Sequence, residues 1–346
     1  MQTTSTNSTS STASSSGLSQ KIVQLPPQAS NSIDETLIVS RLLGDGGQAK
    51  VYEATSPSRP EIGSLAVKVF DKFSIANANG APLREYNLLR KLDDNVNIVN
   101  AYNFKPYTSD LQLPTKTAKT MCSDNAGYMS MELCENGDLF DLISKRGAIP
   151  DTDLLKHLFL QVCNAVNGLN ETANMSHLDL KLDNILIGND LRPKLCDFGF
   201  ACDNSKPITR TFGTLGYMAP EVLNKPMQGS YCASQADIYS LGVILFIFNF
   251  GIPPYNEARE SERLFALFNK KKEYLFKMHP RTRESYKNNS LDGQLVSLIY
   301  KMLSGDLTVR PRCIDEVIND PYFTASDQIS DEESATRLQE LLAATE

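Results

Sequence analysis

Two acids, an amide and a lysine are concentrated between residues 177 and 199. Asp179, Lys181 and Asn184 stand at the spacing H-x-D-x-K-x-x-N, and Asp197 follows within a Cys-Asp-Phe-Gly run. Transfer of a phosphoryl group to a hydroxyl needs an acid for the hydroxyl proton, oxygen ligands for magnesium and a cation for the migrating phosphate. The segment contains all three kinds of group.

A short hairpin is expected to bring the second motif beside the first. Apolar residues at 185–187 and 193–196 have the composition of two short strands. Residues 188–190 read Gly-Asn-Asp, and these residue types tolerate the backbone angles of a tight turn. The pattern therefore predicts that Asp197 lies next to Asn184.

Taken together, the two motifs resemble the catalytic core of the eukaryotic protein kinases, because both occur in the right order and spacing. A hairpin with surface acids and a capping Asn would explain either motif alone. The resemblance implies that Asp179 is the catalytic base, that Asn184 and Asp197 are magnesium ligands, and that Lys181 is the cation on the phosphate side. One position departs from the family: Leu178 replaces the usual arginine.

Length and composition limit the classes of protein that fit. The chain has 346 residues, of which 41% are hydrophobic and 22% charged. These values are typical of a globular protein with about two domains. The most apolar stretch, residues 241–252, is shorter than the roughly 20 residues of a membrane span. We therefore expect it to be a buried helix and expect no membrane span.

Charge and cysteine content point to an intracellular protein, cytoplasmic or nuclear. The net charge of −7 leaves no basic surface for nucleic acid, so no nucleic-acid partner is expected. The amino terminus lacks the charged start and apolar core of a secretory signal. Seven cysteines without regular spacing argue against a disulfide framework or a zinc site.

Three short β-rich runs at 37–43, 50–55 and 65–70 predict antiparallel strands near the amino end. The stretch between the first two contains residues that resemble the kinase nucleotide loop, G-x-G-x-x-G-x-V. These loop residues are Gly44, Asp45, Gly46, Ala49 and Val51. Ala49 replaces the third glycine. Such a loop lets backbone amides approach phosphate oxygens.

The third run carries Ala66 and Lys68 in the order Ala-Val-Lys. An unpaired ammonium in an apolar strand is costly, so Lys68 needs an anionic partner. Pro82 and the helical spacing of Leu and Tyr predict a helix over 82–92, and Glu85 on this helix is the natural partner. In the family, this Lys–Glu pair orients the nucleotide phosphates.

Residues 127–133 predict the last strand of the first lobe. By resemblance, Met131 borders the back of the adenine pocket, and the backbone of Glu132 and Cys134 contacts adenine. Asp138 is expected to reach ribose or substrate. Plain core packing is an equally good explanation for Met131, since Met commonly fills gaps in cores.

The remainder of the chain is expected to be mostly helical. An apolar stripe over 151–172 predicts a long helix that supports the catalytic loop. The segment 213–221 resembles the end of a kinase activation segment, in which Thr214 would touch Asp179 and Lys181. This pattern is typical of Ser/Thr kinases.

The sequence thus predicts an α+β, two-lobed protein kinase fold, with a small antiparallel β-sheet lobe carrying one main helix and a larger, mostly helical lobe. We expect a disordered Ser/Thr-rich tail at 1–30, a nucleotide-binding lobe at 31–134, a catalytic and substrate-binding lobe at 135–323 and an acidic tail at 324–346. A frayed end is favoured over a short docking helix for the last segment. The polar segment 107–125 is longer than most loops.

The predicted function is a Ser/Thr protein kinase that uses ATP and Mg²⁺ to modify protein substrates. A pseudokinase acting as a binding scaffold is the alternative, and a kinase of small molecules is a further one. Asp138 and Asp183 fall where kinases that prefer basic substrates place acids, so we expect a preference for one upstream basic residue.

Leu178 changes what the sequence predicts about regulation. Leucine cannot collect a phosphate on the activation segment, where Thr209 and Thr211 are the candidate acceptors. We expect control by the amino-terminal tail, the 107–125 loop or an unidentified regulatory partner. The alternative is that Lys194 or Arg192 replaces the missing arginine.

Overall fold

The structure is a computed structural model. It describes residues 36–46, 49–70, 80–106, 111–112, 127–224, 229–325 and 327–344. The predicted disordered tail at 1–30 and nearly all of the 107–125 loop lie outside the described residues. What was predicted for them stays a prediction.

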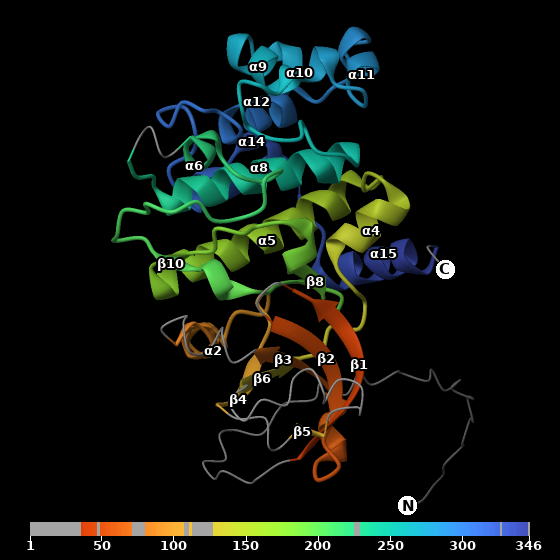
Figure 1. Ribbon diagram of the computed structural model, residues 1–346. Coiled ribbons are helices and arrows are strands. Elements are labelled where there is room, and N and C mark those ends of the chain that lie inside the picture. The colour runs from red at the N-terminus through yellow and green to blue at the C-terminus, as the bar shows by residue number, and fades with distance from the viewer. Residues whose placement is uncertain are drawn as a thin grey trace, which may run out of the picture.

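A twisted sheet forms the smaller lobe (Figure 1). Its strands follow the order β4-β6-β3-β2-β1-β5; all neighbours are antiparallel except β1 and β5. The strands are β1 (Leu37–Asp45), β2 (Ala49–Thr55), β3 (Ser64–Phe70), β4 (Ala101–Lys105), β5 (Leu111–Gln112) and β6 (Gly127–Glu132), and a short helix η1 (Pro60–Ile62) precedes β3. The three strands expected near the amino end and the strand expected at 127–133 are confirmed. Their alternating apolar residues build a small core around Val67 and Tyr128.

One helix, α2 (Ala81–Lys91), packs beside this sheet (Figure 1). It begins after Gly80, whose left-handed backbone (φ 73°) glycine adopts without strain, and Pro82 occupies the first turn. The helix buries Glu85 and Leu89 on its inner face. The helix expected at 82–92 is therefore confirmed within one residue at each end.

The larger lobe is mostly helical, as expected. Its two central helices are α5 (Thr152–Ala173) and α8 (Ala233–Phe250), and α4 (Leu139–Arg146) follows the crossing from the sheet. Asp138 and Asp151 cap α4 and α5 by accepting hydrogen bonds from backbone amides of the first turn. The remaining helices are α6 (Pro220–Leu223), α9 (Arg263–Lys270), α10 (Glu273–Met278), α11 (Arg283–Lys287), α12 (Gly293–Met302), α13 (Ile314–Ile318) and α14 (Pro321–Thr324).

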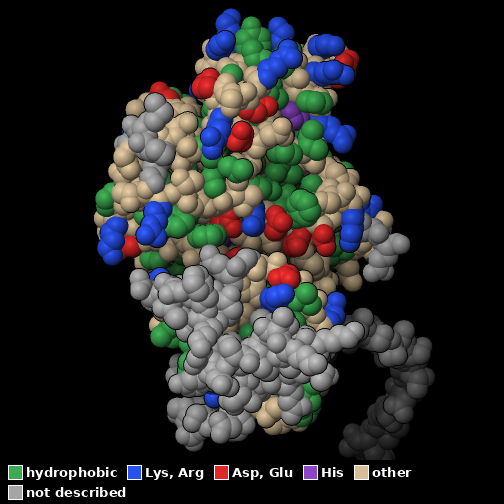
Figure 2. All heavy atoms as spheres, in the orientation of Figure 1, with side chains coloured by type: hydrophobic (Ala, Val, Ile, Leu, Met, Phe, Trp, Pro, Cys, Tyr) green, Lys and Arg blue, Asp and Glu red, His purple; other side chains and the backbone are tan. Residues whose placement is uncertain are grey.

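Helix α8 forms the centre of this lobe. By length and apolar composition it is the one candidate for a membrane span among the described residues, but 78% of it is buried inside the protein. It therefore reads as a core helix, in agreement with the buried helix expected at 241–252. Figure 2 shows Asp and Glu side chains gathered on the surface between the helical lobe and the sheet.

The last segment corrects the sequence prediction, because residues Asp331–Ala343 form helix α15 instead of a frayed end. Ser330 caps the helix by accepting a hydrogen bond from the Glu333 amide. Leu338 is fully buried, and α15 lies beside α4 and α5 (Figure 1). The apolar pattern at the end of the chain is too weak to reveal this, since its burial depends on helices distant in sequence.

Candidate active site

The catalytic loop is anchored to the central helix of the larger lobe. Asp237 in α8 accepts hydrogen bonds from the backbone amides of His177 and Leu178 at 2.7 and 2.8 Å. These bonds hold Leu178 in a left-handed conformation, with φ of 62°. Burial raises the pKa of Asp237 to about 7, while the amide bonds oppose that shift. The anchor fixes the backbone immediately before Asp179.

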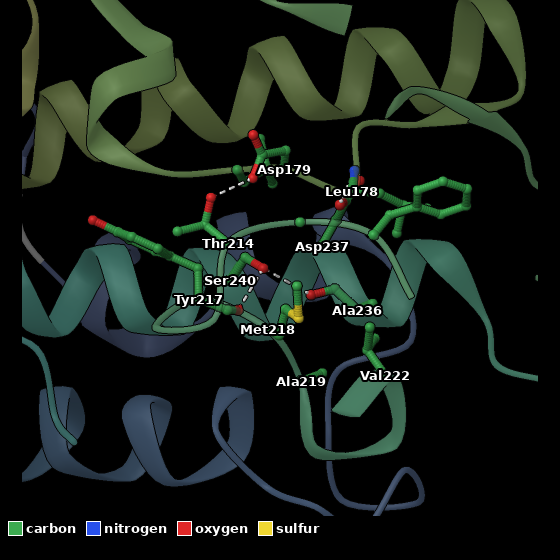
Figure 3. A pocket seen from close by; sticks show the side chains of 13 residues that line it. Leu178, Asp179, Thr214, Tyr217, Met218, Ala219, Val222, Ala236, Asp237 and Ser240 are labelled. Carbon is green, nitrogen blue, oxygen red and sulfur yellow. Dashed lines mark hydrogen bonds between the residues drawn. The ribbon is translucent and has the colours of Figure 1, made fainter. Parts of the chain in front are cut away.

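Three side chains converge on the Asp179 carboxylate (Figure 3 shows Asp179 and Thr214). Thr214 Oγ1 donates to Asp179 Oδ1 at 2.8 Å, and Lys181 Nζ lies 3.1 Å from Oδ2. Lys181 Nζ also donates to Thr214 Oγ1 at 3.3 Å, and Asn184 Nδ2 donates to the Asp179 carbonyl at 2.8 Å. The contact expected between Thr214 and both loop residues is therefore present in the structure.

The short hairpin of β8 (Ile185–Ile187) and β9 (Pro193–Leu195) joins the two motifs as expected. The Cys196 amide donates to the Asn184 carbonyl at 3.0 Å, which places Asp197 beside the catalytic loop. The turn differs in one detail from the prediction. Its left-handed residue is Leu191 (φ 60°) and not one of the Gly-Asn-Asp residues at 188–190. The helical turns η2 (Leu182–Asn184) and η3 (Phe198–Phe200) flank the hairpin.

Lys68 contacts two carboxylates. Glu85 belongs to its own lobe, and Asp197 belongs to the larger lobe. Its Nζ lies 2.7 and 3.0 Å from the Glu85 oxygens and 2.8 Å from Asp197 Oδ1. Burial lowers the pKa of Lys68, but the two carboxylates outweigh it and raise the pKa above its ordinary value. Burial alone would raise the pKa of the Asp197 carboxyl. The attraction of Lys68 outweighs burial, so the pKa of Asp197 lies below its ordinary value. Lys68 is therefore an ammonium facing a charged Asp197.

A fully buried histidine supports the segment that carries Asp197. His177 Nε2 hydrogen bonds with the Cys196 carbonyl at 3.0 Å, and its ring packs edge-on against Phe198 with centroids 5.0 Å apart. Burial lowers the pKa of His177, so the ring is neutral at pH 7. His177 therefore holds the segment that carries Asp197 by packing and by a hydrogen bond.

The glycine-rich segment is the turn between β1 and β2. The register irregularity between Leu42 and Gly44 bends β1 just before the turn, and the Gly46 amide donates to the Ala49 carbonyl at 3.0 Å. Asp45 and Lys50 are cross-strand partners whose side chains form an exposed ion pair at 2.8 Å. The sequence did not suggest that Asp45 has this partner.

The crossing between the lobes follows β6. Met131 is paired with Ala66 on β3 and with Ala101 on β4, so it lies in the sheet. Cys134 is partly buried, and burial raises the pKa of its thiol to about 12. Asp138 accepts from the Asp141 amide at 2.8 Å as the cap of α4. Burial raises the pKa of Asp138, with neighbouring Asp141 and Asp183 contributing.

Leu178 borders a cavity of about 10 Å³ beneath the activation segment (Figure 3). This volume is at the lower limit for one water molecule. Of the described residues that line the cavity, none is Lys or Arg. The Phe200 and Phe212 rings pack 5.6 Å apart near the same segment. Leu178 is thus a buried apolar residue beside a cavity that has no cation among its described lining residues.

The alternative in which Lys194 or Arg192 replaces the missing arginine is wrong. Lys194 Nζ is buried and contacts Glu132 Oε1 at 3.0 Å and the Val96 carbonyl at 3.2 Å. Arg192 Nη2 donates to Asp331 Oδ2 of α15 at 2.6 Å. Both cations are thus engaged behind the crossing between the lobes, and no sequence pattern indicates either contact.

The donors at the site fit magnesium. Mg²⁺ in phosphoryl-transfer sites is usually held by one or two carboxylates together with substrate phosphates and water. The carboxylate side chain of Asp197 is 47% exposed. Asn184 donates from its amide nitrogen to Asp179, which leaves the amide oxygen of Asn184 for other contacts. Elsewhere in the described part of the chain there is no group of three His, Cys, Asp or Glu suited to a metal.

Comparison with known proteins gives consistent matches. A family model described as "Protein kinase domain" matches residues 37–323. The chain is 34% identical over 286 residues to testis-specific serine/threonine-protein kinase 1 of Mus musculus, covering 80% of this chain and 69% of that protein.

Longer proteins match as well. SNF-related serine/threonine-protein kinase of Homo sapiens is 32% identical over 267 residues, 76% of this chain and 30% of that protein. Probable serine/threonine-protein kinase CCRP1 of Zea mays is 29% identical over 295 residues, 84% of this chain and 41% of that protein. The chain therefore spans less than half the length of these two relatives.

Proposed function

Since the chain belongs to the protein kinase family, we propose that it transfers the γ-phosphate of ATP to serine and threonine hydroxyls of protein substrates. The observation that carries the proposal is the position of the Asp179 carboxylate, which contacts Lys181 and Thr214 and accepts a hydrogen bond from Asn184 Nδ2 at 3.2 Å. One carboxylate is thus oriented by a cation, a hydroxyl and an amide.

In this proposal Asp179 accepts or orients the proton of the attacking hydroxyl. Lys181 stands next to it as the cation that faces the migrating phosphate, and Thr214 fixes the carboxylate through its 2.8 Å hydrogen bond. Because these groups are already in place, little reorganisation is needed when substrate binds.

The nucleotide would lie between the sheet and the crossing. Lys68, fixed by Glu85, would bind the phosphates, and Asn184 and Asp197 would hold magnesium, which neutralises charge on the phosphates when it is bound. The backbone around Glu132 and Cys134 would contact adenine, with Met131 behind it and Asp138 near the ribose. The phosphate loop would comprise Gly44, Asp45, Gly46, Ala49 and Val51, with Ala66 on the adjoining strand.

The six cysteines in the described part of the chain are all free thiols, which supports a reducing compartment such as the cytoplasm or nucleus. A pseudokinase would keep the fold without the reaction. The contacts of Lys68, Asp179, Asn184 and Asp197 favour an active enzyme.

The direct test is incorporation of labelled phosphate from ATP into a generic basic protein. We expect Asp197→Ala to reduce turnover by at least 100-fold, about 2.7 kcal/mol of transition-state stabilisation, while the protein stays folded. Asp203→Ala, which removes a partly exposed carboxylate at the end of the short strand β10 (Cys202–Asp203), is the matched control and should retain activity. Near wild-type turnover of a folded Asp197→Ala variant would refute the magnesium assignment, and an inactive wild type would favour the scaffold.

A further inference from the structure

The turn of the β8–β9 hairpin, residues 188–192, lies directly behind the crossing between the lobes. Asn189 Oδ1 accepts from the Glu135 amide at 3.0 Å, and the Gly188 carbonyl accepts from Asn136 Nδ2 at 2.8 Å. The Ile187 amide just before the turn donates to the Gly137 carbonyl at 2.8 Å. Residues 135–137 are thus hydrogen bonded to this hairpin along their length.

A series of alternating charges continues from this turn in two directions. Towards the sheet, Lys194 Nζ lies 3.7 Å from Asp190 Oδ2 and 3.0 Å from Glu132 Oε1, at the end of β6. Away from the sheet, Arg192 lies 3.9 Å from Asp190 and 2.6 Å from Asp331. The acidic and basic side chains therefore alternate from α15 to the last residue of β6.

Helix α15 holds Asp331 firmly at the end of this series. Its Oδ1 accepts from Gln161 Nε2 at 2.9 Å and lies 3.0 Å from His157 Nε2, both on α5. The helix itself is docked by the ion pair of Arg337 with Asp151 at 2.8 Å and by the buried side chain of Leu338. Asp331 is therefore a fixed contact for Arg192.

We propose that α15 is a positioning element for the nucleotide site, and that Asp331 and Arg192 act through the 188–192 turn to hold the crossing between the lobes in the geometry that binds adenine. The proposal rests on the proposed function, which places adenine against residues 132–134. A crossing that is already ordered loses less entropy when ATP binds. Loss of the contacts that order it should therefore weaken nucleotide binding.

The expected effect is modest. Asp331 and Arg192 side chains are 45% and 30% exposed, so solvent screens part of their attraction. We expect Asp331→Asn and Arg192→Met each to raise the KM for ATP by about threefold to tenfold, with kcat and the KM for a peptide substrate changed less than twofold. If Asp331 and Arg192 act through one contact, the KM for ATP of the double variant should be no higher than that of either single variant.

Glu332→Gln is the matched control, because it removes an exposed carboxylate from the same first turn of α15 and should leave all constants unchanged. Arg192→Lys keeps the cation and should recover part of the ATP affinity. Thermal unfolding checks that every variant is folded; Arg192→Met keeps α15 docked through Arg337, so it tests the idea even if Asp331→Asn unfolds.

Calorimetric titration with ADP and magnesium separates this proposal from the proposed function. Weaker ADP binding by the variants would support the positioning role even if the wild type transfers no phosphate. Variants that melt at lower temperature but bind ADP and ATP like the wild type would show that α15 only stabilises the larger lobe. That result would overturn the inference.

Discussion

Two buried cations in this protein bind carboxylates in different surroundings. The Arg310 side chain is fully buried, and its two terminal nitrogens donate to the Glu221 carboxylate at 2.5 and 3.1 Å. Its remaining donors reach the Ser304 and Gln235 carbonyls at 2.7 to 3.0 Å. The guanidinium also lies 5.0 Å from the ring centre of Tyr239. All of its hydrogen-bonding capacity toward the protein is used.

Lys68 is also nearly buried, with 11% of its side chain exposed, but one of its partners is not. Glu85 is 5% exposed, whereas the Asp197 carboxylate is 47% exposed and reaches open space. The Arg310–Glu221 pair is complete within the protein. The Lys68–Asp197 pair ends at a carboxylate that a ligand can approach. Both pairs have similar distances, so partner exposure distinguishes a structural pair from one suited to binding.

Breaking the complete pair should have the largest effect. Arg310→Met leaves the Glu221 carboxylate buried without its partner, which costs about 3–5 kcal/mol of folding free energy. Urea unfolding measures this loss, and Arg259→Gln, which breaks an exposed ion pair, should cost under about 1 kcal/mol. Equal losses for the two variants would contradict the comparison.

Breaking the Lys68–Asp197 pair should affect activity more than stability. Lys68→Met removes the cation expected to position phosphates, and we expect turnover to fall about 100-fold, or 2.7 kcal/mol. When Lys68 is lost, Asp197 can be solvated, and burial, which already raises the pKa of Glu85, favours the protonated form of that carboxyl. The free energy of unfolding should therefore fall by less than in Arg310→Met. Phosphate transfer and urea unfolding of the same preparation decide this. A variant that is fully active, or as unstable as Arg310→Met, would show that Lys68 is a structural cation.

A third carboxylate, the partly buried Asp138, is the one we expect to recognise a basic residue of the substrate. Burial raises the pKa of Asp138, neighbouring Asp141 and Asp183 add to the shift, and the side chain also caps α4. Asp138→Asn keeps a good cap but removes the charge. We expect the preference for a peptide with an upstream arginine over one without it to fall about tenfold, roughly 1.4 kcal/mol. Equal use of both peptides by the wild type would refute the basic preference.

The features that sequence predicted correctly depend on local pattern. Helix 82–92 was placed to within one residue of α2 because Pro82 and the apolar spacing are both local signals. The hairpin pattern likewise predicted that Asp197 lies next to Asn184, which the Cys196–Asn184 hydrogen bond bears out, whereas the roles of Asp179 and Asp197 stay predictions. The Lys68–Glu85 contact was also predicted, because a buried ammonium requires an anion.

The features that sequence missed depend on contacts between distant segments. Leu191 adopts a left-handed conformation although Gly188 and Asn189 lie in the same turn, so the whole hairpin, and not residue preference, selects that position. The docking of α15 depends on Asp151 and Arg192, which lie far away in the chain. Lys194 contacts Glu132 only because the β8–β9 hairpin lies beside the last residue of β6. The periodicity of apolar residues in a sequence does not reveal contacts between such distant positions.

The smallest effect is expected at Thr209 and Thr211, because no Lys or Arg is among the described residues that line the cavity beside Leu178. Thr209 and Thr211 are exposed, and the segment that carries them is held by the Tyr231 hydroxyl, which donates to the Arg210 carbonyl at 2.9 Å, and by packing near Leu178. Because these contacts need no phosphate, replacing Thr209 and Thr211 together by Ala should change turnover less than twofold. The measurement compares this variant with untreated and phosphatase-treated wild type. A loss of roughly 100-fold, about 2.7 kcal/mol, would mean that a phosphate orders this segment despite Leu178, and the apolar packing would then be insufficient by itself.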